Sequence, residues 1–194
     1  EPRLVFADWL TERGDARGPL LSEACRIAQL PAGEERSSRS SQLLQQLKSR
    51  PKPLEHPAIT WIHRRGLPTA LRSSSLSAVI DVGSALIEAS PALDEIMISE
   101  GTTNATSVKK LLTQPWFGRI RRLRWLHLGA EALAGFEVPA AVGLRSVGLI
   151  PPVMHDPVKV YQRLSTVAAL AGLAELDLGM GGLNDEALGS LFSG

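Results

Sequence analysis

The 194-residue chain has few of the residues that usually mark a disulfide-bonded, metal-binding or membrane protein. Its one cysteine, Cys25, excludes an intrachain disulfide and a zinc site made of thiolates, and we interpret it as a small buried hydrophobic residue. No apolar run approaches the roughly 20 residues needed to cross a bilayer. The net charge is only +1 at pH 7, so overall charge gives no attraction to nucleic acid or to an anionic membrane.

Catalytic and metal-binding motifs are also missing. His56, His63, His127 and His155 form no H-x-x-x-H pair and have no carboxylate at ligand spacing, so the sequence predicts no metal site. It contains no G-x-S-x-G elbow and no phosphate-cradling glycine loop, and we expect neither enzymatic activity nor a cofactor. The N-terminus lacks the basic and then apolar order of a signal peptide, which favours a cytoplasmic protein. The chain starts at Glu1 without a methionine, as expected of a fragment of a longer protein.

What remains is an ordinary globular composition, with 44% hydrophobic and 21% charged residues, in which the first sixty residues favour helices. A first helix is predicted from Pro2 to the stop at Gly14, with Trp9 packed in the core. A second is expected over residues 20–30. A polar link then leads into a third helix around residues 43–49, which the prolines of the following R-P-K-P end.

The stretch PRLVFADWLTERGDARGPLL, residues 2–21, resembles a known family. It is similar to the repeat-companion domain of multi-copy proteins in myxobacteria and planctomycetes, although Phe6 and Thr11 stand where Tyr and Glu are usual. The matching residues are Arg3, Leu4, Val5, Ala7, Asp8, Trp9, Leu10, Glu12, Arg13, Gly14 and Asp15. This resemblance implies a helical domain that precedes short repeats, often leucine-rich ones, and it implies no activity.

The rest of the chain repeats the pattern L-x-x-L-x-L, with aliphatic substitutions. Copies start at Leu93, Leu123, Leu144 and Leu173, separated by 30, 21 and 29 residues, which is close to the spacing of leucine-rich repeats. A degenerate copy starts at Leu67. The last copy resembles the ribonuclease-inhibitor-like class, with Asn184 or Asp185 as helix cap. The asparagine that usually follows the strand is replaced by Gly101, Glu131, Pro152 and Gly181.

These patterns predict an α/β protein, with a helical cap over residues 1–65 and a short leucine-rich-repeat solenoid with a curved parallel sheet over residues 66–194. We expect the helical part to dock on the first repeat. The segment IPPVMHDP, residues 150–157, is expected to form a protruding loop. The chain stops at GSLFSG without a polar capping repeat, so we expect either a continuing natural chain or association through this end.

In such a solenoid the leucines face the core and the intervening residues lie on the concave face. The copy at Leu123 therefore displays Trp125 and His127, unless the loop or the N-terminal helices cover the tryptophan. Arg124 and Arg145 flank the rows near the strand starts. The predicted rows are Glu95, Trp125, Ser146 and Glu175, and Met97, His127, Gly148 and Asp177.

We expect a non-catalytic module whose protein partner, of unknown identity, docks on the concave face with Trp125 as central anchor. Glu95, Glu175 and Asp177 border this patch and would repel a polyanion, so nucleic acid is not favoured, and no membrane is expected. Two alternatives remain open. One is polyanion or nucleic-acid binding through a basic cluster, and the other is a regulatory domain of a larger enzyme. The cluster consists of Arg119, Arg121, Arg122 and Arg124.

Overall fold

The computed structural model describes residues 2–49, 54–64, 67–100, 103–150, 157–179 and 189. Contacts divide the chain into two compact units. Unit 1 consists of Glu1–Pro53 and Trp61–Thr69, and unit 2 of Leu54–Thr60 and Ala70–Gly194. The boundary predicted after residue 65 falls at residues 65–66, which lie outside the described ranges, and it stays a prediction.

Unit 1 contains three helices, α1 (Pro2–Glu12), α2 (Arg17–Gln29) and α3 (Glu34–Lys48). The three predicted helices are therefore confirmed. Gly14 has a left-handed φ of 69°, which suits the turn after α1. The polar link predicted before the third helix is wrong, because α3 already starts at Glu34 within it. Glu34 and Glu35 lie in its first turn, where negative charge favours a helix N-terminus.

The core of unit 1 forms on small residues. Ala7 and Leu10 of α1 pack against Leu21 and Cys25 of α2, so the prediction of a buried Cys25 is confirmed. Gly18 lies so close to α1 that an added Cβ would stand 2.7 Å from the Ala7 carbonyl oxygen.

The core position predicted for Trp9 is wrong, because its residue surface is 46% exposed. Trp9 is two positions from the buried Ala7, which is about 200° around the helix. Its ring instead stacks on Phe6, with centroids 5.8 Å apart, and the Arg13 guanidinium lies 3.9 Å above it. The tryptophan of this segment is therefore a surface residue of α1.

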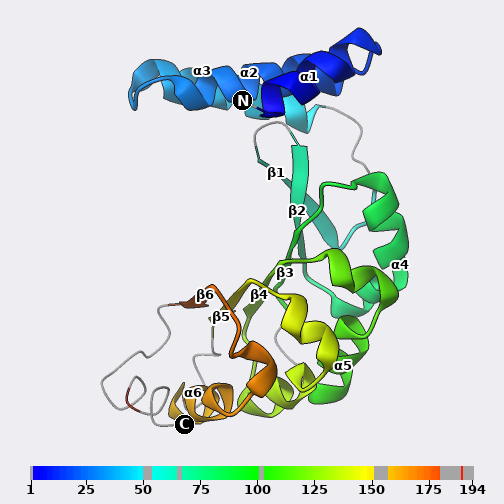
Figure 1. The fold of residues 1–194 in the computed structure, drawn as a ribbon, viewed down its shortest axis with the longest axis vertical. Helices are drawn as coiled ribbons and strands as arrows, with labels where there is room; N and C mark the ends of the chain where they lie inside the picture. Colours follow the sequence, from blue (N-terminus) through cyan, green and yellow to red (C-terminus); the bar gives the residue numbers. More distant parts are fainter. Residues whose placement is uncertain are drawn as a thin grey trace. The chain divides into compact units, whose positions relative to one another are not determined.

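Six strands form one sheet in the order β1 to β6, and β2 to β6 pair in parallel (Figure 1). The α/β class is confirmed, but the helical interpretation of residues 1–65 is wrong at its end, where the chain forms β1. The β-branched and aromatic residues there suit a strand. The strands are β1 (Ile59–Arg64), β2 (Leu67–Ser73), β3 (Glu95–Ile98), β4 (Arg122–Leu126), β5 (Ser146–Ile150) and β6 (Glu175–Leu178).

Within unit 2, the connections between parallel strands carry helices that lie along one face of the sheet (Figure 1). The Ser75 and Asn104 side chains accept hydrogen bonds from the first turns of α4 and α5 and thereby cap them. These helices are α4 (Leu76–Ala89), α5 (Ala105–Leu112), η1 (Pro115–Arg119), η2 (Ala130–Phe136), η3 (Pro139–Gly143), α6 (Pro157–Ser165) and η4 (Ala168–Leu170). The opposite face of β3 to β6 carries none of the described helices of this unit, and we call it the open face.

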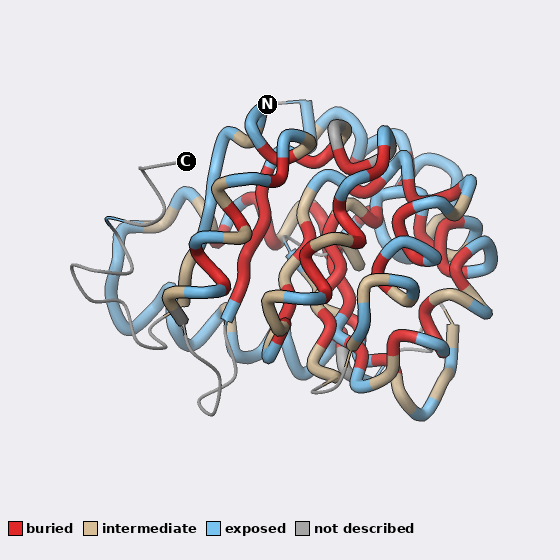
Figure 2. The backbone as a smooth tube through the Cα atoms, turned by 90° about the horizontal axis from the view of Figure 1, so that it is seen from below, coloured by how far each residue is buried: buried red, intermediate tan, exposed pale blue. Residues whose placement is uncertain are grey.

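The core of unit 2 fills the space between strands and helices, as the buried segments in Figure 2 show. Each central strand contributes alternate side chains, such as Ile96 and Ile98 of β3, and the helices contribute Val108, Phe117 and others. None of the helices in the described residues is long and apolar enough to cross a membrane.

Two predictions for the C-terminal half concern residues without a described structure. The expected IPPVMHDP loop falls on residues 151–156, and the helix of the last repeat with its cap at Asn184 or Asp185 falls on residues 180–188. Both segments lie outside the described residues.

Candidate functional site

The strand register decides which side chains the open face displays. Leu71, Ile96, Leu123, Val147 and Leu176 are aligned across β2 to β6, at intervals of 25, 27, 24 and 29 residues. Leu71, Ile96, Leu123 and Val147 are buried toward the helices. The alternate positions therefore point to the open face, in two rows. The rows are Ala70, Glu95, Arg122, Ser146 and Glu175, and Arg72, Met97, Arg124, Gly148 and Asp177.

Trp125 is not on this face, so the predicted exposed anchor is wrong. It pairs with Ile98 on one side and Leu149 on the other, and its relative exposure is 0%. Its row position belongs to Arg122, and the position predicted for His127 belongs to Arg124. The repeat in fact starts at Ile120, which is buried and gives the pattern Ile120-x-x-Leu123-x-Trp125.

A sequence signal for this register exists. With Ile120 as the start, the four copies are separated by 27, 24 and 29 residues, which is more even than 30, 21 and 29. The ladder hydrogen bonds of a parallel sheet need equivalent positions in neighbouring strands, so even spacing was the better guide.

His127 is exposed, as predicted, but it lies just beyond the end of β4. Its φ of 68° is left-handed, and its backbone N–H donates to the Ile150 carbonyl at 2.6 Å. This conformation ends the strand, and Leu128 is buried again. The imidazole therefore lies beside the carboxyl end of β4 and not within a row of the open face.

A chain of ion pairs crosses the open face from β3 to β6. Arg122 lies 2.8 Å from Asp94 and 3.3 Å from Glu95. The other Glu95 oxygen lies 3.3 Å from Arg124, whose guanidinium also lies 3.5 Å from Asp177. Two arginines on one strand are thus held by three acidic side chains from two other strands and their approaches.

Glu95 is the buried centre of this network. Its side chain is 1% exposed, whereas those of Arg122 and Arg124 are 33% and 37% exposed. A carboxylate removed from water is stable only if cations surround it, and here it stands between two. Glu95 was predicted as an exposed border of the binding patch, and this is wrong, because both arginines cover it. Its effect on the surface is to hold the two guanidiniums in place.

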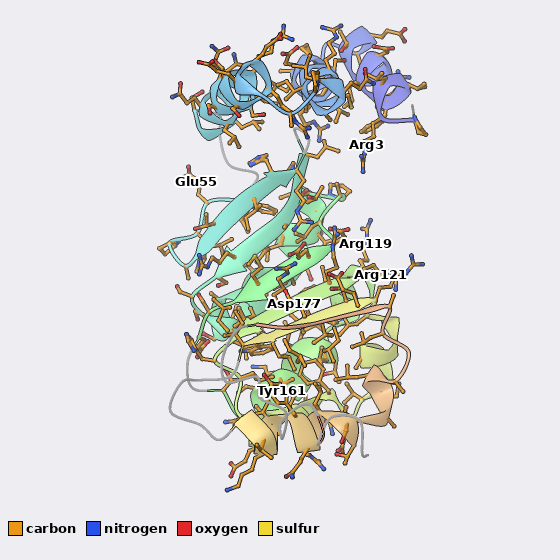
Figure 3. The ribbon with its side chains drawn as sticks, turned by 90° about the vertical axis from the view of Figure 1, so that its left-hand side faces the viewer. Arg3, Glu55, Arg119, Arg121, Tyr161 and Asp177 are labelled. Atoms are coloured by element: carbon orange, nitrogen blue, oxygen red, sulfur yellow. The ribbon has the colours of Figure 1, made fainter. Side chains whose placement is uncertain are left out.

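The remaining residues of the open face are available to a ligand. Arg72 and Glu175 are exposed, Met97 is partly buried, and Asp177 lies within the sheet as Figure 3 shows. At the carboxyl ends of the strands the surface becomes apolar, with Leu126 and the 36% exposed Ile150. Of the residues predicted as binding, the structure brings Met97, Arg124, Glu175 and Asp177 to this face, and Arg72, Arg122, Leu126 and Ile150 were missed.

The predicted basic cluster is divided in two. Arg122 and Arg124 lie on the open face and are neutralised, whereas Arg119 and Arg121 project from one edge of the sheet (Figure 3). Arg145, at the start of the next strand, is exposed at the same edge, because its backbone N–H donates to the Arg121 carbonyl at 2.8 Å. We call Arg119, Arg121 and Arg145 the arginine edge.

Comparison of the chain with protein-family models, curated proteins and solved structures gives no match. The open face and its charges therefore carry the functional argument. Among the described residues, no group of three or more His, Cys, Asp or Glu side chains could hold a metal ion.

Unit 1 contains a separate hollow of about 310 Å³ between α2, α3 and β1. Its wall is mostly apolar, from residues such as Ile27 and Leu43, and its polar lining comes from Arg36, Ser40 and His63. Partial burial lowers the pKa of His63, because it disfavours the charged imidazolium. The sequence did not indicate this hollow, since its lining comes from three elements that only the fold brings together.

Proposed function

We propose that this protein is a non-catalytic protein-interaction module of leucine-rich-repeat type, whose protein partner binds the open face of β2 to β6. The observation that carries the proposal is the pair of aligned rows on that face, in which Arg72, Met97, Arg124 and Asp177 share one line. Such a surface offers contacts spread over five strands and no enclosed pocket, which suits a macromolecule better than a small molecule.

The repeat-type assignment is supported by three features together. Consecutive strands are neighbours in the sheet, the aligned residues recur every 24 to 29 positions, and the connecting helices share one face. The resemblance of residues 2–21 to repeat-companion domains agrees with a module that precedes repeats, and we retain that family as part of the proposal.

The chemistry of the face favours a partner with an apolar centre and charges of both signs. Met97, Leu126 and Ile150 provide apolar surface, while Arg72 and Asp177 provide opposite charges that fix orientation. Glu95 keeps Arg124 in position before binding, so less side-chain entropy is lost in the complex.

The test compares a face variant with a matched control. Proteins from the source organism that bind the wild-type chain but not the Arg72→Ala/Met97→Ala double variant are identified, and the affinity of each purified candidate is measured. We expect at least a tenfold loss, about 1.4 kcal/mol. The Lys159→Ala/Gln162→Ala variant changes two exposed residues of α6, on the helical side, and should bind like the wild type. Equal affinity of the purified partner for wild type and face variant would refute the proposal.

A further inference from the structure

The arginine edge contains three cations that the fold itself does not neutralise. Arg119 donates only to the Pro91 carbonyl at 3.4 Å and Arg121 only to the Gly143 carbonyl at 3.0 Å. Within the described part of the chain, neither these two guanidiniums nor that of Arg145 has a carboxylate within ion-pair distance. Arg122 and Arg124, only one to three positions along the chain from Arg121, share three carboxylates. The contrast shows that the edge keeps its positive charge while the face loses its own.

The geometry of the edge is a line of positive charge. Pro91 precedes β3 and Gly143 precedes β5, so Arg119 and Arg121 reach along the edge in opposite directions. Arg145 stands one strand beyond Arg121, at a typical strand separation of about 4.8 Å. Because the guanidiniums diverge and do not converge on one point, the edge suits several separate anionic groups better than one phosphate.

We propose that the arginine edge docks an extended segment of the partner protein that is rich in Asp and Glu. This inference rests on the proposed function, because it names the chemistry of the partner that the open face binds. Side chains on one side of an extended segment recur about every 6.6 Å, so alternate carboxylates can meet successive arginines. Each guanidinium is planar and can hold a carboxylate through two parallel hydrogen bonds.

Acidic groups next to the edge disfavour a nucleic acid as the occupant. Asp94 and Glu175 directly follow or precede the same strand starts, and Asp177 lies further along β6. A nucleic-acid backbone carries its charges in a dense, continuous series, so it would pass these carboxylates as well as the three arginines. A short peptide segment can place its carboxylates at the arginines alone.

The probe for the test is a fluorescently labelled octaglutamate peptide, whose affinity for the full chain is measured by polarisation at low salt. We expect the Arg121→Glu/Arg145→Glu variant to bind at least tenfold more weakly than the wild type. The control is Lys109→Glu/Lys110→Glu, which makes the same change in net charge on exposed residues of α5, and we expect it to bind within about threefold of the wild type. An Arg121→Gln/Arg145→Gln variant repeats the measurement if charge reversal impairs folding.

Three results would overturn the inference. They are an equal loss in both charge-reversal variants, no detectable binding of octaglutamate to the wild type, and tighter edge-dependent binding of an oligonucleotide of the same charge. The purified partner separates this failure from failure of the proposed function. If its binding needs Arg72 and Met97 but not Arg121 and Arg145, the open face is the interaction surface and the edge is not part of it.

Discussion

The Glu95 carboxylate lies at the centre of the open face, where solvent hardly reaches it. Its two oxygens lie 3.3 Å from one arginine each, so the carboxylate holds Arg122 and Arg124 side by side on β4. Removal of its charge would leave two guanidiniums close together without their shared partner. At the scale of single residues, Glu95 is therefore a positioning residue of the face.

We predict that Glu95→Gln lowers the free energy of unfolding by about 2 kcal/mol, less than the 3–5 kcal/mol typical of a fully buried pair, because both arginines are about one-third exposed and can be rehydrated. Glu175→Gln changes the same residue type in the same row at an exposed position and should have little effect. Urea denaturation of both variants checks the difference. Equal stabilities would show that Glu95 does not hold the network.

The two tryptophans allow a second test at this scale. Trp125 is fully buried in unit 2, so Trp125→Ala should cost roughly 3–5 kcal/mol. Trp9 is 46% exposed and makes only surface contacts with Phe6 and Arg13, so Trp9→Ala should cost about 1 kcal/mol or less. Thermal unfolding of the two variants measures this order, and the reverse order would contradict the burial described for both side chains.

At the scale of elements, the contact between α4 and η1 depends on the absence of a side chain. A Cβ at Gly83 would overlap the Trp116 indole, which is itself buried against α4. Glycine lowers helix propensity by about 1 kcal/mol relative to alanine, so an alanine here would stabilise an isolated helix. The packing of the indole against α4 outweighs that preference.

We predict that Gly83→Ala destabilises unit 2 by about 1–3 kcal/mol, the usual range for overpacking, despite the gain in helix propensity. Gly118→Ala in η1 provides the control, because a Cβ there meets no atom within 4 Å and should be tolerated. Differential scanning calorimetry gives both values. A Gly83→Ala variant as stable as the wild type would mean that Trp116 does not pack on this glycine.

At the scale of the whole molecule, the two units have separate cores, and they differ in how they respond to acid. Unit 1 carries His63 beside its hollow, where burial lowers the pKa of the imidazole below the 6.5 of an exposed histidine. The unfolded chain therefore binds the proton more readily than the folded chain. Stability contributed by the neutral ring is complete above about pH 6.5 and is lost as the pH falls through the lower folded pKa.

We predict that acidification from pH 7.5 to pH 5 lowers the melting temperature of the protein, and that His63→Gln makes this decrease smaller. The comparison requires melting curves of both proteins over this range, with the helical signal of α1 to α3 as readout. An identical acid-induced decrease in the variant would exclude His63 as a source of the pH dependence.

The sequence by itself determined the elements that depend on short stretches of chain. Gly14, Pro31 and the prolines after residue 49 end the three helices where they are expected, and the alternating aliphatic residues predict β3, β4, β5 and β6. Cys25 is buried as its residue type suggested. Stop residues and periodicity act within one or two turns or within one strand, so such features are visible without knowledge of the fold.

Only the tertiary structure decided which of two apolar faces turns inward. Helix α1 has Leu4, Ala7 and Leu10 on one side and Val5, Phe6 and Trp9 on the other, and the close approach of α2 at Gly18 selects the first. In β4 both Trp125 and Leu126 could follow Leu123 into the core, and pairing with β3 and β5 selects Trp125. The same pairing brings Arg124 to Glu95 and to Asp177, 53 positions further along the chain. Such choices depend on neighbours distant in sequence, and no local pattern contains them.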